Sequence, residues 1–137
     1  TYPRYDGHTF AEQYKMVREK YPNIEIVADV STVEEGLIAD ELGCDYIATT
    51  LWGYTPDTDT HEDIIQEFRQ PNVEIVRELA SKCKHPIIAE GRFFNAEYAI
   101  KAMKAGAYAV TIGWGITRPQ IITEYIVTQM KKEIPGL

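Results

Sequence analysis

The sequence predicts an α/β fold, the C-terminal half of a (β/α)8 TIM barrel, in which four parallel strands alternate with helices. Short apolar segments alternate along the chain with amphipathic helical segments. The strand segments are apolar on both faces, as in a parallel sheet covered by helices. The chain also repeats itself, because Ala28-Asp29 matches Ala89-Glu90 and Leu42-Gly43 matches Ala105-Gly106. No Gly-x-Gly-x-x-Gly turn follows the first strand, which favours half of an eight-stranded barrel over a small open sheet.

The first β-α-β unit follows an amphipathic helix. That helix is predicted from residue 9 to the turn at Pro22, because a proline disfavours helix in the residue before it. Residues 24–29 then read as a short apolar strand. A second helix over residues 33–42 begins after a Ser-Thr cap and ends at a glycine. Residues 46–51 form the next strand and complete the unit.

The second unit follows a long polar connection over residues 51–70. Loops of this length are usually functional or mobile. The remaining helices and strands are predicted over residues 71–81, 87–90, 95–105, 108–112 and 119–132. A glycine-rich connection separates the last strand from the last helix.

The composition predicts one domain over residues 1–137 and argues against several classes of partner. Fourteen Lys and Arg face 21 Asp and Glu, so the formal net charge is -7 and no basic arm for nucleic acid is present. No apolar run is long enough to span a bilayer, and no secretory leader opens the sequence. Cys44 and Cys83 have no metal-like spacing and are expected to be reduced thiols. We therefore expect a cytoplasmic protein that binds neither nucleic acid nor a membrane.

Two carboxylates end predicted strands. In a (β/α)8 barrel the active site lies at the C-terminal ends of the strands, so Asp29 and Glu90 are the catalytic candidates. A partly dry carboxylate there can act as a general acid or base, or can orient a sugar hydroxyl. The alternative is that each carboxylate only bonds to nearby loop N–H groups or to an arginine, and this alternative weighs more heavily on Asp29.

A phosphate site is predicted after the last two strands. Gly113 and Gly115 let the backbone approach a ligand, and Arg118 can donate two hydrogen bonds to phosphate oxygens. Gly91 and Arg92 would form the other wall. Two glycines after a strand can also form a plain turn, but the nearby arginines favour a phosphate site.

Other polar residues near the strand ends could serve the site or have ordinary structural roles. Thr49, Thr50 and Tyr54 could contact a polyol, although threonine is also common in strands. The three histidines share no metal spacing, so no metal site is predicted. Trp114 could cover a ligand or simply close the barrel mouth.

Taken together, these residues resemble the N-acetylmannosamine-6-phosphate 2-epimerase family, which consists of cytoplasmic (β/α)8 enzymes of bacterial sialic acid and amino-sugar catabolism. The matching stretches are ADVST (28–32), TTLWGYT (49–55), IAEGR (88–92), GAYAV (106–110) and GITRP (115–119). They lie in one order and cover nearly the whole chain.

The resemblance implies reversible epimerisation at C2 of a phosphorylated amino sugar without a cofactor, interconverting N-acetylmannosamine 6-phosphate and N-acetylglucosamine 6-phosphate. It implies that Glu90 is the reacting carboxylate and that Asp29 holds sugar hydroxyls or catalytic groups. Thr50, Tyr54 and Arg92 would contact the substrate. The phosphate would be surrounded by Gly91, Arg92, Gly113, Gly115 and Arg118.

The resemblance also implies missing parts. Family members are much longer, and their upstream half supplies strands one to four and a catalytic lysine, so the chain alone is expected to be nearly inactive. We expect the N-terminal barrel half, or a second copy of the chain in a homo-oligomer, to cover the open sheet edges. The alternatives are another phosphate-binding TIM-barrel enzyme and a non-catalytic, self-associating half-barrel.

Overall fold

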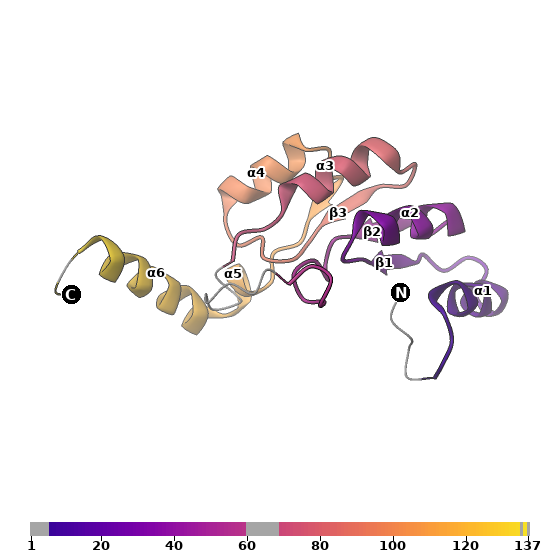
Figure 1. Cartoon of the computed structure of the whole chain (residues 1–137), viewed down its shortest axis with the longest axis horizontal. Helices are drawn as coiled ribbons and strands as arrows, with labels where there is room; N and C mark the ends of the chain where they lie inside the picture. Colours follow the sequence, from indigo (N-terminus) through magenta and orange to yellow (C-terminus); the bar gives the residue numbers. More distant parts are fainter. Residues whose placement is uncertain (1–5, 60–68, 135, 137) are drawn as a thin grey trace.

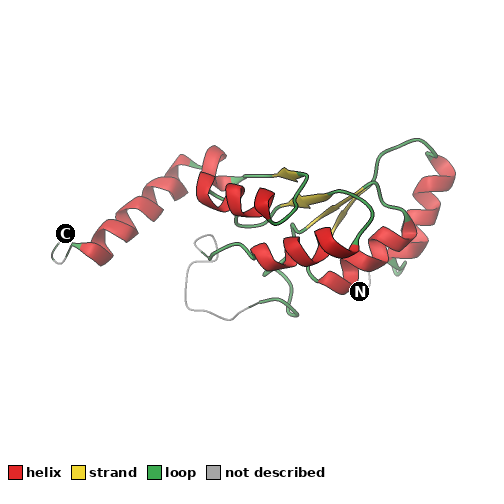
Figure 2. Cartoon of the chain, turned by 90° about the horizontal axis from the view of Figure 1, so that it is seen from above, coloured by secondary structure: helices red, strands yellow, loops and turns green. Residues whose placement is uncertain are grey.

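The structure is a four-stranded parallel sheet covered by helices on one face (Figures 1 and 2). The computed structural model describes residues 6–59, 69–134 and 136. The loop residues His61 and Asp63 lie outside the described residues. No described helix is long and apolar enough to cross a membrane.

The strand order follows the chain order, β1-β2-β3-β4. The strands are β1 (Val27–Asp29), β2 (Tyr46–Ala48), β3 (Ile87–Ala89) and β4 (Ala109–Val110). Each pairs in parallel with its neighbour in the chain, and the order never reverses as it would in a doubly wound sheet. This arrangement confirms the predicted α/β half-barrel.

The helices follow the predicted order. They are α1 (Phe10–Lys20), α2 (Val33–Leu42), α3 (Val73–Lys82), α4 (Ala96–Lys104), α5 (Trp114–Thr117) and α6 (Pro119–Glu133). Side-chain oxygens of Thr9, Thr32, Asn72 and Asn95 cap four of the helices at their N-termini. The helix α2 ends at Gly43 in the left-handed conformation, as predicted.

The strands are shorter than predicted, and α5 was not predicted. The segment predicted as a strand over residues 24–29 pairs regularly only from Val27, and its first residue, Ile24, is exposed. Ladder-like hydrogen bonds continue beyond the strand ends, from Thr49 N to Ile88 O (3.2 Å) and from Thr111 N to Ala89 O (2.9 Å). β1 and β4 each pair on one side only among the described residues. The other side of each strand has no neighbouring strand whose hydrogen bonds could lengthen the regular pairing.

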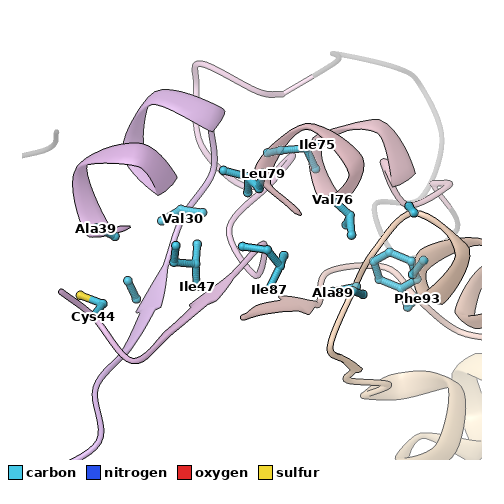
Figure 3. Close-up of a cluster of buried hydrophobic side chains, with 14 residues drawn as sticks. Val30, Ala39, Cys44, Ile47, Ile75, Val76, Leu79, Ile87, Ala89 and Phe93 are labelled. Carbon is cyan, nitrogen blue, oxygen red and sulfur yellow. The ribbon is translucent and has the colours of Figure 1, made fainter. Parts of the chain in front are cut away.

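The core lies between the sheet and the helices α2, α3 and α4. Ile47 and Ile87 rise from neighbouring strands toward Val76 and Leu79 of α3 (Figure 3). All four side chains are almost fully buried, which makes this cluster the main apolar contribution to stability.

The other face of the sheet is open. In β1, Ala28 points into the core while Val27, next to it in the strand, is 49% exposed. Helix α6 points away from the sheet in both views (Figures 1 and 2), and it has no buried residue. In a closed barrel the open face would line the interior.

The Asp40 carboxylate joins α2 to the start of β3. Its Oδ1 accepts hydrogen bonds from the backbone N–H groups of Lys84 and His85, both at 2.9 Å, and lies 2.8 Å from His85 Nδ1. Burial opposes the ionisation of Asp40, but these hydrogen bonds outweigh burial and lower its pKa. A group whose pKa falls on folding adds stability above its unfolded pKa, and this stability is lost as the pH falls through the folded value.

We expect Asp40→Asn to lower the free energy of unfolding by about 1–3 kcal/mol near neutral pH, because hydrogen bonds to a charged acceptor are the stronger ones. The difference from the parent should shrink as the pH falls below the unfolded pKa of about 4 and through the lowered pKa of the folded carboxylate. Urea unfolding at neutral and acidic pH measures this, with Glu41→Gln on the exposed side of the same helix as the control. A difference that persists unchanged in acid would contradict the prediction.

Candidate active site

The C-terminal ends of β1, β2 and β3 bring the predicted polar residues to one edge of the sheet. Asp29 ends β1 and is exposed there, in register with Ala48 of β2. Thr50 follows β2, and its hydroxyl donates a hydrogen bond to Asp29 Oδ1 at 2.8 Å. Asp29, predicted as catalytic, and Thr50, predicted to bind the substrate, therefore form one hydroxyl–carboxylate unit.

Thr49 fixes the backbone of Glu90. Its hydroxyl donates to the Glu90 carbonyl at 2.8 Å and accepts from the Glu90 N–H at 3.1 Å. Thr49 is 1% exposed, so its side chain is used within the protein rather than offered to a sugar. The half-buried Glu90 side chain makes no hydrogen bond or ion pair with another residue that the structure describes. Its carboxylate is therefore available to a ligand or a reacting group.

Arg92 is placed differently from the sequence expectation. Its guanidinium is buried and donates hydrogen bonds to the carbonyls of Trp52 and Gly53, each at 2.7 Å. It also lies over the Tyr54 ring, with Cζ 4.1 Å from the ring centroid. A phosphate bound directly by these nitrogens would have to compete with both carbonyls.

The last connection holds the predicted phosphate residues. Gly113 precedes α5, and a Cβ on Gly115 would lie 2.6 Å from the Phe94 carbonyl oxygen, so only glycine fits there. Trp114 stacks on Phe94 with ring centroids 5.0 Å apart and also contacts the Tyr125 ring. Arg118 joins α5 to α6 and is exposed, and its side chain makes no ion pair among the described residues.

One groove on the described part of the molecule lies away from this site. A groove of about 710 Å³ lies between α1 and the end of α2, lined mainly by apolar atoms of residues such as Tyr14 and Leu42. It lies at the opposite end of the sheet from the strand C-termini. In the described parts of the chain, no group of three His, Cys, Asp or Glu side chains could hold a metal ion.

Sequence reasoning missed two roles inside the protein at this site: the hydrogen bonds of Thr49 to the Glu90 backbone and those of Arg92 to the loop after β2. Thr49 lies two residues after the core residue Ile47, so the two-residue period of side chains along a strand could have indicated that it faces the core. The contacts of Arg92 carried no sequence signal beyond the glycine at position 53, whose φ is +74°. His85, by contrast, lies just before β3, at the opposite end of the strand from Glu90.

Comparison with known protein families identifies the family of this half-barrel. The family model described as "Putative N-acetylmannosamine-6-phosphate epimerase" (NanE) matches residues 2–132. The chain belongs to this family. The resemblance inferred from the five short motifs is confirmed.

Relatives within the NanE family are moderately similar to the chain. It is 47% identical over 126 residues to a protein of Caldanaerobacter subterraneus subsp. tengcongensis, covering 92% of this chain and 50% of the relative. It is 38% identical over 130 residues to a protein of Listeria welshimeri, covering 95% of this chain and 53% of the relative. Both are described as "Putative N-acetylmannosamine-6-phosphate 2-epimerase". The chain spans about half the length of the curated relatives it matches.

Solved structures agree with this assignment. The N-acetylmannosamine-6-phosphate 2-epimerase from Clostridium perfringens superimposes with a TM-score of 0.79 at 35% identity, covering 92% of this chain and 51% of that one. Thiamine phosphate pyrophosphorylase from Pyrococcus furiosus superimposes with a TM-score of 0.57 at 23% identity, which is a likeness of fold alone.

Proposed function

We propose that this chain forms the second half of an N-acetylmannosamine-6-phosphate 2-epimerase. The reaction would interconvert N-acetylmannosamine 6-phosphate and N-acetylglucosamine 6-phosphate by removing the C2 proton and returning it to the opposite face. The observation that carries the proposal is that Glu90 follows β3 at the same C-terminal edge of a NanE-family sheet as the hydrogen-bonded pair Asp29 and Thr50.

Each residue takes a role that fits its surroundings. The half-buried Glu90 carboxylate would stabilise or transfer a proton at the reacting end of the sugar. The Asp29–Thr50 pair would accept and donate hydrogen bonds to sugar hydroxyls, and Tyr54 lies on the adjoining loop. Gly91, Gly113, Gly115 and Arg118 would surround the phosphate. No step of this scheme uses a cofactor.

The direct test is a chimeric barrel. The first half of the Caldanaerobacter relative is joined to this chain, and the loss of the C2 proton signal of N-acetylglucosamine 6-phosphate in D₂O is followed by NMR. We expect exchange and appearance of the manno epimer. A folded chimera that exchanges the C2 proton of a different sugar phosphate, but not of this one, would favour another phosphate-binding barrel enzyme.

We expect Arg118→Met to weaken binding of N-acetylglucosamine 6-phosphate to the 137-residue chain about 10- to 100-fold. The reason is that hydrogen bonds between charged partners contribute about 1.5–3 kcal/mol each. Inorganic phosphate should lose affinity to a similar extent, because the two ligands share the contact. Calorimetric titration measures both, with Arg77→Met on the exposed face of α3 as the control. Unchanged affinity in Arg118→Met would remove Arg118 from the phosphate site.

The open sheet face favours a second candidate, self-association without turnover. Val27 and Tyr108, which is 66% exposed, leave apolar surface uncovered, and β1 and β4 each have one unpaired side among the described residues. Sedimentation of the purified chain distinguishes the two cases. A dimer that binds the sugar phosphate but does not exchange its C2 proton would favour the self-associating half-barrel.

A further inference from the structure

We propose that Arg92 is a positioning residue, which fixes the turn that carries Glu90 against the loop after β2 and does not itself bind the phosphate. The inference rests on the proposed function, because Glu90 is the carboxylate whose position matters. The contacts of the guanidinium, the backbone around it and a second attachment at Thr49 all support this role.

Among the residues that the structure describes, the guanidinium is held by the loop after β2. Arg92 is 3% exposed, and its two terminal nitrogens donate to Trp52 O and Gly53 O at 2.7 Å each. The forked geometry suits two neighbouring carbonyls, and a buried cation needs such partners. Its Cζ lies 4.1 Å from the Tyr54 ring centroid and 5.6 Å from that of Trp52, so aromatic faces also stabilise the charge.

The backbone on both sides is adapted to this contact. Arg92 has a φ of 63° and is the one non-glycine residue with positive φ among those the structure describes. Such a conformation costs free energy and persists where surrounding contacts hold it. Opposite it, a Cβ on Gly53 would lie 1.9 Å from Arg92 Nη1. The absence of a side chain at Gly53 therefore leaves the space that the guanidinium occupies.

Glu90 lies between two attachments to the β2 end. On its N-terminal side, the Thr49 hydroxyl bonds to both backbone polar groups of Glu90, at 2.8 and 3.1 Å. Two residues further along, Arg92 bonds to the loop that continues from Thr49. A turn fixed at both ends presents its side chain in one direction, which a reacting carboxylate requires.

The same contacts argue against a phosphate role for Arg92. Its nitrogens already donate to two carbonyls in a buried setting, whereas Arg118 is exposed and makes no ion pair with any residue that the structure describes. Substitution of Arg118 should therefore weaken binding of the phosphate group, whereas substitution of Arg92 should weaken binding of the sugar through Glu90.

The test compares two ligands in the 137-residue chain. Arg92→Lys keeps the charge but cannot bond to two carbonyls in a planar fork. We expect it to weaken N-acetylglucosamine 6-phosphate about tenfold or more while inorganic phosphate changes less than about twofold. Arg118→Met should weaken both. An equal loss of both ligands in Arg92→Lys would identify Arg92 as a phosphate ligand and overturn the proposal.

Amide hydrogen exchange tests the attachment without any ligand. Arg92→Lys should speed exchange at residues 52–54 and 90–91 about tenfold or more, because the two hydrogen bonds that join these segments are lost. The control is Arg77→Lys on α3, which should leave these amides unchanged. Unchanged exchange in Arg92→Lys overturns the proposal. If the parent binds neither ligand but Arg92→Lys still speeds exchange, the attachment stands, and the proposed function is then decided by proton exchange in the chimeric barrel.

A second variant covers the case in which Arg92→Lys does not fold. Gly53→Ala places a Cβ where Nη1 lies and should displace the guanidinium with Arg92 intact. Its control is Gly7→Ala, which has a similar φ of 77° but nothing within 4 Å of the new Cβ. Faster exchange at residues 90–91 in Gly53→Ala and not in Gly7→Ala supports the proposal, and equal behaviour of the two variants contradicts it.

Discussion

Glu90→Gln is expected to reduce 2-epimerase turnover of the chimeric barrel by about 10²- to 10⁴-fold, the usual effect of removing a proton-transfer group. Glutamine preserves the size of the side chain but can neither carry the negative charge nor exchange a proton. The backbone of Glu90 is held by Thr49, so the turn should keep its shape. NMR exchange of the C2 proton measures the loss.

The matched control is Glu97→Gln on α4, where the carboxylate is exposed and pairs with Lys101 at 2.6 Å. It should retain turnover within about twofold, because exposed ion pairs contribute little. Substrate affinity should change far less than turnover in Glu90→Gln. If Glu90→Gln keeps at least a third of the parent turnover, Glu90 is not the proton-transfer group. Asp29 then becomes the remaining candidate for that role.

Leu79→Ala is expected to lower the free energy of unfolding by about 2–5 kcal/mol, since Leu79 is 0% exposed and lies at the centre of the helix–sheet core. The loss combines the buried apolar surface with the cavity that the smaller side chain leaves. Urea unfolding followed by circular dichroism measures it. Ile100→Ala on α4, where the side chain is 54% exposed, should cost about 0.5 kcal/mol or less.

A second change tests whether Leu79 packs on α2 as described. A Cβ on Gly36 would lie 2.4 Å from Leu79 Cδ2, so Gly36→Ala collides with leucine but not with alanine at position 79. Gly36→Ala should therefore stabilise the Leu79→Ala protein by about 1 kcal/mol, through helix propensity and a smaller cavity, and should not stabilise the parent, where Leu79 must shift. Equal effects in both backgrounds would show that α2 and α3 do not meet there.

Much of the fold could be predicted because it follows from local pattern. The alternation of apolar strands with capped helices, and the repeat of Ala28-Asp29 at Ala89-Glu90, specify parallel strands whose ends carry acids. Strand lengths were predicted less well, because they depend on partners across the sheet. The four-residue helix α5 was missed, since its sequence Trp114-Gly115-Ile116-Thr117 has low helix propensity and its glycine packs on the Phe94 backbone.

The candidate site was predicted by position but not by side-chain direction. The end of a strand places Asp29, Thr50 and Glu90 at one edge whatever their neighbours are. The direction of a long side chain such as Arg92 depends on carbonyls 39 and 40 residues away in the chain. No spacing rule contains that information, and an arginine between glycine and phenylalanine looks the same whether it is exposed or buried.

The strand order β1-β2-β3-β4 also bears on how the chain folds. Within this sheet, each of β2, β3 and β4 pairs with the strand synthesised just before it, so pairing can follow the order of synthesis. A growing polypeptide can add one strand and its covering helix at a time, burying Ile47 before Ile87 is needed. Assembly in this order keeps the loops that must close short, and it limits how long an apolar strand is exposed to aggregation during synthesis.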